Sequence, residues 1–236
     1  MRETGGAGYV GGDQINQSGP YATGKVVFHG GRPGAAPRHE PPARSTVLVL
    51  LSNPIDTPRL RLDEEFRAIR QAVNEARHRD QIDLKVDMAL RHRDLQTLLR
   101  DHRPAVVHYA GHSGGSGIAL LDPIGRAQPV PPRALEDLFA IVKEFVRCVV
   151  LNACLTDVQA SAIAKHVPCV VGLSNSVLDP VAIEFAAGFH GALASGESIA
   201  QAFEFGRNLP ALAGLNNEGP LLFSANGVAE RLTITG

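Results

Sequence analysis

Dense hydrophobic runs recur from residue 45 onward, and segments with apolar residues at helical spacing separate them. This alternation predicts an α/β fold, in which a mainly parallel sheet is covered by helices on both faces. Several runs are continuous Val and Leu, as expected of strands that are buried on both faces. The predicted strands cover residues 46–52, 82–88, 104–110, 146–152, 168–174 and 219–225.

The segments between the strands carry helix signals. Acidic residues favour a first helical turn, and Asp63 and Glu64 precede an apolar stripe that includes Ile69 and Val73. Asp179 and Pro180 fit the N-cap and first position of a helix that runs to residue 194. The other predicted helices cover residues 91–101, 132–144, 155–166 and 198–207. Residues 113–131 have no helical period and predict a short β-hairpin beside the sheet.

Residues 1–44 depart from this pattern. They contain ten glycines and five prolines, and their only apolar run is 25–29 (KVVFH). A segment of this composition buries little surface, so we expect it to be flexible, with one short strand at most. The length of 236 residues then fits one folded domain, 45–236, with an N-terminal appendage.

Charge and cysteine content narrow the function classes. The formal net charge is −1, from 23 basic and 24 acidic residues, and this balance predicts neither a nucleic-acid nor a membrane-surface partner. No apolar run approaches the roughly 18 residues of a membrane span, and no secretory signal is recognisable. Three cysteines are too few for a disulfide framework. We therefore expect a reducing, cytoplasmic setting.

Two reactive side chains follow consecutive strands of the predicted sheet. His112 comes directly after the third strand and Cys154 directly after the fourth. Ligands bind at the carboxyl ends of the strands in open parallel sheets, and strands joined by a crossover usually lie side by side. The topology thus predicts that an imidazole and a thiol meet at one edge of the sheet.

The setting of Cys154 suits a nucleophile. It stands at the start of the predicted helix 155–166, where unpaired N–H groups stabilise a thiolate, which is the reactive form. The alternative is that Cys154 is a small buried hydrophobe, the usual fate of a free cysteine. Position alone leaves both interpretations open. Cys148 and Cys169 lie inside strand runs and are predicted to belong to the core.

Three segments resemble the signature segments of CHAT domains, which belong to the caspase-like peptidase clan. They are 107–113 (VHYAGHS), 149–154 (VVLNAC) and 170–179 (VVGLSNSVLD). Residues 48–54, 59–65 and 200–205 also resemble bacterial members, in the right order over about 45–227. The resemblance implies a caspase-like three-layer α/β/α sandwich with a mainly parallel six-stranded sheet. It further implies a cysteine peptidase acting on proteins in a bacterial defence or signalling pathway, without a cofactor.

The resemblance also implies roles for single residues. His112 would be the base, Cys154 the nucleophile, and the backbone amides of Ser113 and Cys154 the oxyanion hole. Ser113 replaces the usual glycine. Asn175 stands where many members have Trp, and Asn152 where relatives that cleave after Arg or Lys often have Asp, so both bear on the substrate-binding pocket. Asp179 matches an acidic position that lines this pocket in some relatives, and it is equally a helix cap.

Other motifs offer weaker alternatives. Residues 111–115 match G-x-S-x-G, the nucleophile elbow of serine hydrolases, but the helix that must follow Ser113 is missing. His108 and His112 have a metal-ligand spacing without the helix that it needs, so no metal is expected and His108 is predicted to pack in its strand. A domain that has lost its activity and serves as an interaction module is a further alternative. Residues 1–44 could recruit a partner protein to the peptidase.

Overall fold

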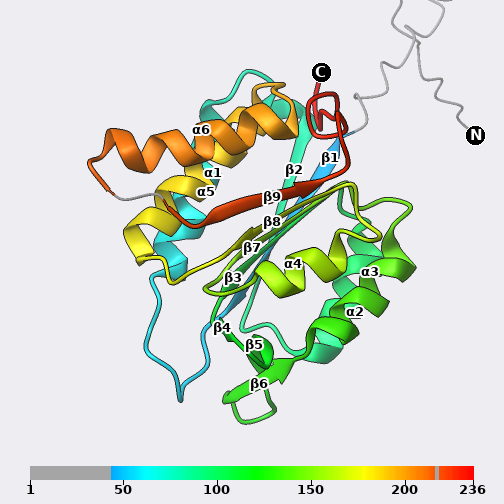
Figure 1. Ribbon diagram of the computed structural model, residues 1–236, viewed down its shortest axis with the longest axis vertical. Coiled ribbons are helices and arrows are strands. Elements are labelled where there is room, and N and C mark those ends of the chain that lie inside the picture. Colours follow the sequence, from blue (N-terminus) through cyan, green and yellow to red (C-terminus); the bar gives the residue numbers. More distant parts are fainter. Residues whose placement is uncertain (1–43, 216–217) are drawn as a thin grey trace, which may run out of the picture. The chain divides into compact units, whose positions relative to one another are not determined.

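The computed structural model describes residues 44–215 and 218–236, and its main sheet has six strands. The strand order is β2-β1-β3-β7-β8-β9, in which β9 alone runs antiparallel to its neighbour (Figure 1). The strands are β1 (Ser45–Ser52), β2 (Ile82–Met88), β3 (Val106–Gly111), β7 (Cys148–Asn152), β8 (Cys169–Leu173) and β9 (Pro220–Ser224). Each coincides with a predicted strand to within two residues at either end. The prediction of a mainly parallel six-stranded α/β sheet is confirmed.

Helices cover both faces of this sheet (Figure 1). One face carries α1 (Leu62–Glu75), α5 (Asp179–Ala194) and α6 (Ile199–Leu212), and the other carries α2 (His92–His102), α3 (Pro132–Val142) and α4 (Asp157–Ile163). A short 3-10 turn, η1 (Arg79–Gln81), leads into β2. None of the helices in the described ranges is long and apolar enough to cross a membrane.

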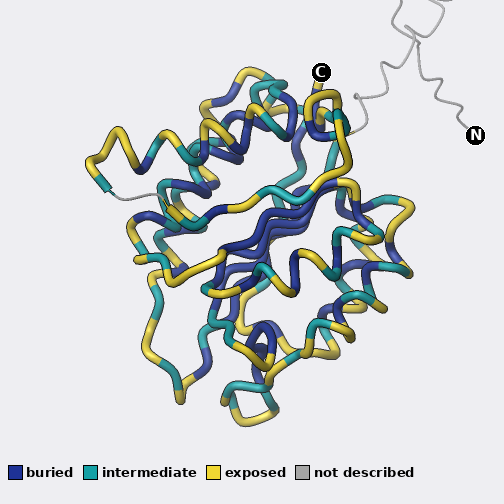
Figure 2. The backbone as a smooth tube through the Cα atoms, viewed as in Figure 1, coloured by how far each residue is buried: buried dark blue, intermediate teal, exposed yellow. Residues whose placement is uncertain are grey.

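Successive residues of each strand enter different cores. In β1, Val47 and Val49 pack toward α1 and α5, whereas Leu48 and Leu50 pack toward α2 and α3. This follows from the period of two in a strand, and it explains why strands buried on both faces read as unbroken apolar runs. The centre of the sheet is accordingly the most buried part of the described chain (Figure 2).

A second, antiparallel sheet of three strands lies between β3 and α3 in the sequence. It consists of β4 (Ser113–Gly114), β5 (Gly117–Leu121) and β6 (Ala127–Val130). The predicted hairpin corresponds to β5 and β6, and β4 extends it directly from the end of β3. Gly117 is required here, because its φ is +120° and a Cβ would lie 1.8 Å from the carbonyl oxygen of Val130.

Two helix boundaries differ from the prediction. The helix predicted to begin at residue 155 begins at Asp157, because Leu155 has a φ of +54°, which a helix does not allow. The last helix continues past residue 207 to Leu212 and includes Pro210. Proline removes only its own N–H, and Ala213 still donates to the carbonyl of Leu209. The strand predicted near residues 25–29 and the proposed appendage up to residue 43 lie outside the described residues.

Candidate active site

The carboxyl ends of β3, β7 and β8 enclose a cavity of about 110 Å³. The N-terminal parts of α1 and α5 complete its wall. The residues that line it are Leu60, Arg61, Leu62, Glu65, Gly111, His112, Ser113, Asn152, Ala153, Cys154, Leu173, Val177, Asp179, Ala182 and Ile183. The structure thus brings His112, Ser113, Cys154, Asn152 and Asp179 to one cavity, whereas Asn175 is exposed and outside its lining.

Neighbouring parallel strands place His112 and Cys154. Ala110 of β3 pairs with Asn152 of β7, and each reactive residue follows its strand by no more than two positions. Gly111 allows the end of β3 to lie close to its neighbours, because a Cβ there would lie 2.6 Å from the Tyr109 hydroxyl and 2.7 Å from the Ser52 carbonyl. The Tyr109 hydroxyl also donates to the carbonyl of His112 at 3.0 Å.

The imidazole of His112 is oriented by a backbone carbonyl. Its Nε2 lies 2.7 Å from the carbonyl oxygen of Pro58, in the segment between β1 and α1. A carbonyl oxygen can only accept, so Nε2 carries a hydrogen in this contact. The Nδ1 of the neutral ring is therefore the nitrogen that can take up a proton.

Cys154 is half-buried, with its Sγ 3.9 Å from the carbonyl oxygen of Val177. Its own carbonyl accepts a hydrogen bond from the Ser113 hydroxyl, so the two residues after β3 and β7 are joined across the cavity. The N–H of Cys154 donates to no backbone carbonyl of the described chain. Contrary to the prediction, Cys154 does not start a helix but precedes α4 by three residues.

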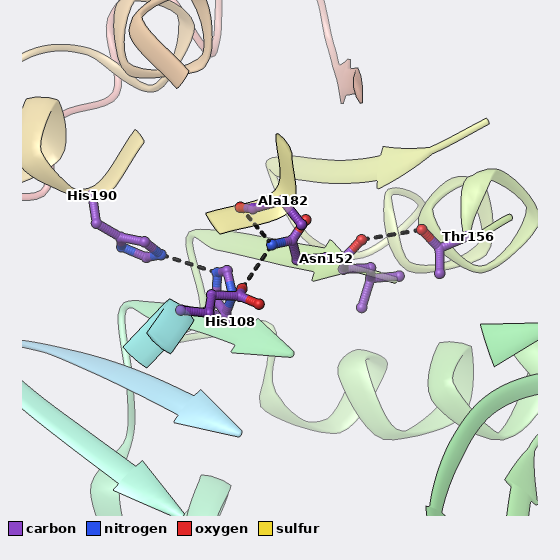
Figure 3. A network of polar contacts seen from close by, with 7 residues as sticks. His108, Asn152, Thr156, Ala182 and His190 are labelled. Carbon is purple, nitrogen blue, oxygen red and sulfur yellow. Dashed lines mark hydrogen bonds and ion pairs between the residues drawn. The ribbon is translucent and has the colours of Figure 1, made fainter. Parts of the chain in front are cut away.

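A buried polar network includes two of the residues that line the cavity, Glu65 and Asn152 (Figure 3). The Nε2 of His108 lies 2.8 Å from Glu65 Oε1, and the Nδ2 of Asn152 donates to the same oxygen at 2.7 Å. The Asn152 Nδ2 also donates to the Ala182 carbonyl at 3.0 Å. The Nε2 of His190 lies 3.0 Å from His108 Nδ1. The network ties β3 and β7 to α1 and α5.

The protonation of His190 and the carboxylate of Glu65 limit how the hydrogen bonds in this network can run. Burial, and then the neighbouring His108, lower the pKa of His190 well below its ordinary value, so this ring is neutral near pH 7. Glu65 as a carboxylate only accepts, and His108 then uses its Nε2–H toward Glu65. The Nδ1 of His108 lies 3.0 Å from the Nε2 of His190, and either ring can be the donor in this contact. The Nε2–H of His108 and the side-chain amide of Asn152 thus both donate to Glu65 Oε1.

A comparison with known protein families identifies the family of the chain. The family model described as "CHAT domain" matches residues 32–205, about three quarters of the sequence. The chain belongs to the CHAT domain family. The match begins inside the glycine- and proline-rich segment, and a domain boundary at residue 44 stays a prediction.

Two known proteins resemble this CHAT domain at greater distance. A protein of Gillisia limnaea named "Probable protease" is 20% identical over 156 residues, which are 64% of this chain and 27% of that protein. The crystal structure of the Drosophila initiator caspase Dronc matches with a TM-score of 0.54 and 11% identity, over 96% of both chains. At this identity the second likeness shows the fold alone, and it confirms that the CHAT domain has a caspase-like fold.

Glu65 is the residue of the cavity that the sequence interpretation missed. By position it is one of the acids in the first turn of α1, but only 3% of its surface is exposed. A signal was available, because Leu62, Glu65, Ile69 and Val73 share one buried face of α1 at helical spacing. An acid on such a face needs buried partners. His108 was correctly predicted to pack in its strand, but its two partners were not anticipated.

The remaining predicted residues take structural positions. Asn152 is buried, and its amide nitrogen is already engaged by Glu65 and Ala182. Cys148 and Cys169 are fully buried register partners on β7 and β8, as expected of core residues. Among the described residues there is no cluster of three or more His, Cys, Asp or Glu side chains arranged to hold a metal ion.

Proposed function

We propose that this CHAT domain is a cysteine endopeptidase in which Cys154 is the nucleophile and His112 its acid and base. One observation carries the proposal: both residues follow adjacent parallel strands and line the same cavity. The caspase-like fold and the relative named as a protease support the reaction class. Asp179, on the wall of the same cavity, would contact the substrate.

The reaction begins when the thiol proton moves to Nδ1 of His112 and the Cys154 thiolate attacks the scissile carbonyl carbon. The electron pair of the carbonyl moves to its oxygen, which the N–H groups of Ser113 and Cys154 would bind. Collapse of this intermediate breaks the carbon–nitrogen bond, and His112 gives its proton to the leaving amine. A thioester remains on Cys154.

Deacylation restores the enzyme. His112 takes a proton from water through Nδ1, and the resulting hydroxide attacks the thioester carbonyl. The carbon–sulfur bond breaks, the product leaves as a carboxylic acid, and His112 gives its proton to the sulfur of Cys154. The contact between His112 Nε2 and the Pro58 carbonyl supports these steps, because it keeps Nδ1 as the exchanging nitrogen throughout.

The structure gives less support to Ser113 as the nucleophile. Its hydroxyl already donates to the Cys154 carbonyl, and it enters strand β4 rather than a helix. The nucleophile elbow of serine hydrolases requires a helix at that point.

The proposal is tested with a peptide library that varies the P1 residue, whose carbonyl carbon is attacked. The wild type is expected to hydrolyse some of these peptides, whereas Cys154→Ala and His112→Ala should hydrolyse none. Unchanged circular dichroism and urea unfolding of both variants would exclude loss of the fold. A wild type that cleaves no peptide would instead favour an inactive interaction module.

We further propose a cytoplasmic role in bacterial defence or signalling, with residues 1–44 recruiting a partner protein. The resemblance of 48–54 and 200–205 to bacterial members and the composition of the N-terminal segment support this role. Deleting residues 1–44 should leave hydrolysis of short peptides unchanged while reducing the cleavage of a protein delivered by that partner.

A further inference from the structure

We propose that Glu65 provides the negative charge that makes the cavity select a basic P1 side chain. This inference rests on the proposed peptidase function, and it assigns the substrate class of that site. Glu65 is part of the cavity lining although the residue itself is almost completely buried. A P1 side chain that enters the cavity next to Cys154 would therefore meet this carboxylate.

The two oxygens of Glu65 have different surroundings. Oε1 accepts from Asn152 Nδ2 and contacts His108 Nε2, which fixes the position of the carboxylate. Oε2 accepts no hydrogen bond from the described residues. It is also not fully enclosed by protein atoms. One oxygen is held by two neighbours, and the other has no partner among the described residues of a cavity that Glu65 lines.

The described chain provides no cation of its own for this oxygen. Among the described residues that line the cavity, Arg61 carries the only guanidinium, and its side chain pairs with Glu64 at the surface. His108 faces the other oxygen of Glu65, Oε1, at 2.8 Å, and behind it His190 is neutral near pH 7. The acceptor capacity of Oε2 is left unfilled, and a guanidinium or ammonium group from the substrate would supply a charged donor to it.

Asp179 is the other carboxylate on the wall, and its position differs. Its Oδ2 accepts from the backbone N–H of Arg61 at 3.0 Å, and the residue is only half-buried. Water screens a charge at such a place, so ion pairs with it contribute little. Glu65 should therefore dominate the selection of charge, and Asp179 should modulate it.

Binding is measured first, because it needs no turnover. The probes are butylguanidinium and its neutral isostere butylurea, titrated by NMR into Cys154→Ala. Butylguanidinium should bind more tightly. Adding Glu65→Gln should weaken its binding about tenfold or more, as for loss of a buried charged hydrogen bond. Adding Asp179→Asn should weaken it no more than about threefold. The introduced glutamine would keep an acceptor for Asn152, so the fold should persist; a urea titration checks this.

A second variant leaves Glu65 in place. Ile183→Lys puts an ammonium group on the cavity wall, and Ile183→Met is the uncharged control of similar length. The lysine should abolish the preference for butylguanidinium over butylurea, and the methionine should preserve it. This pair decides the question even if Glu65→Gln fails to fold.

Turnover is measured next, with peptides that carry Arg, Lys, citrulline or norleucine at P1. The active chain should prefer Arg and Lys, and Glu65→Gln should lose this preference. Hydrolysis without a basic preference would overturn the inference and leave the peptidase intact. No hydrolysis by the wild type would overturn the proposed function, while the binding measurements would still decide the role of Glu65. Equal binding of butylguanidinium before and after Glu65→Gln would refute the proposed role of Glu65. A larger loss of binding with Asp179→Asn than with Glu65→Gln would refute it as well.

Discussion

The carboxylate of Asp179 accepts a hydrogen bond from the backbone N–H of Arg61 at 3.0 Å. Asp179 is the first residue of α5, and Arg61 is the N-cap residue of α1, so the contact joins the beginnings of two helices at the cavity. The sequence interpretation placed Asp179 as the N-cap of its own helix. In the structure Leu178 holds that position, without a side-chain cap.

Substitutions at Asp179 should separate the effect of this hydrogen bond on stability from the effect of the carboxylate charge. Asp179→Asn keeps an oxygen that can accept from the Arg61 N–H, so the free energy of unfolding should change little. Asp179→Ala removes the acceptor and should lower that free energy by about 1 kcal/mol. Urea unfolding curves of the two variants measure the difference. Equal stability of Asn and Ala would show that the contact contributes nothing to the fold.

The three cysteines should react with iodoacetamide at different rates. Burial raises the pKa of the Cys148 thiol well above its ordinary value, with a further contribution from Cys169, and burial also raises the pKa of Cys169. Cys154 is half-exposed in the cavity. It should be labelled first, and the other two only after unfolding.

Mass spectrometry of labelled peptides identifies the site and its rate. Cys154→Ala should remove the fast phase, and His112→Ala should slow it, because the imidazole can no longer take the thiol proton. A fast phase that persists in Cys154→Ala would contradict the assignment of the nucleophile.

Ser113→Ala should reduce peptide hydrolysis by about tenfold or less. The variant loses one hydrogen bond, from the Ser113 hydroxyl to the Cys154 carbonyl, but it keeps the backbone N–H. Ser116→Ala is the matched control, because Ser116 is exposed in the turn after β4. Steady-state kcat/KM of both variants gives the comparison. An inactive Ser113→Ala together with an active Cys154→Ala would identify a serine hydrolase instead.

Stability should decline in mild acid because of His190. Its pKa in the folded chain lies well below the value of about 6.5 for an unfolded histidine. As the pH falls below about 6.5, the unfolded chain binds a proton at this position that the folded chain excludes. The free energy of unfolding then falls.

The comparison of urea unfolding at pH 7.5 and 5.5 tests this expectation. His190→Gln cannot titrate, while its amide can still donate to His108. Between these pH values the variant should lose roughly 1 kcal/mol less than the wild type. The same loss in both proteins would mean that His190 takes up a proton without unfolding the chain.

Local patterns in the sequence were sufficient for the strands, their mainly parallel arrangement and the positions of His112 and Cys154 at strand ends. Apolar runs and helical spacing report which residues are buried, and both are properties of a few neighbouring residues. The rule that parallel strands present their carboxyl ends to one edge then predicted that His112 and Cys154 lie close together. The start of α4 could not be predicted from spacing, because a single backbone angle at Leu155 moved it to Asp157.

The partners of the polar residues were decided only by the tertiary structure. Glu65 and His108 are 43 residues apart, Pro58 and His112 are 54, and His108 and His190 are 82. Spacing along one element cannot encode such pairs, because they depend on the order of strands in the sheet and on which helix crosses which face. The sequence showed an acid on the buried face of α1, but only the packing of α1 against β3 and β7 supplied the donors that hold it at the cavity.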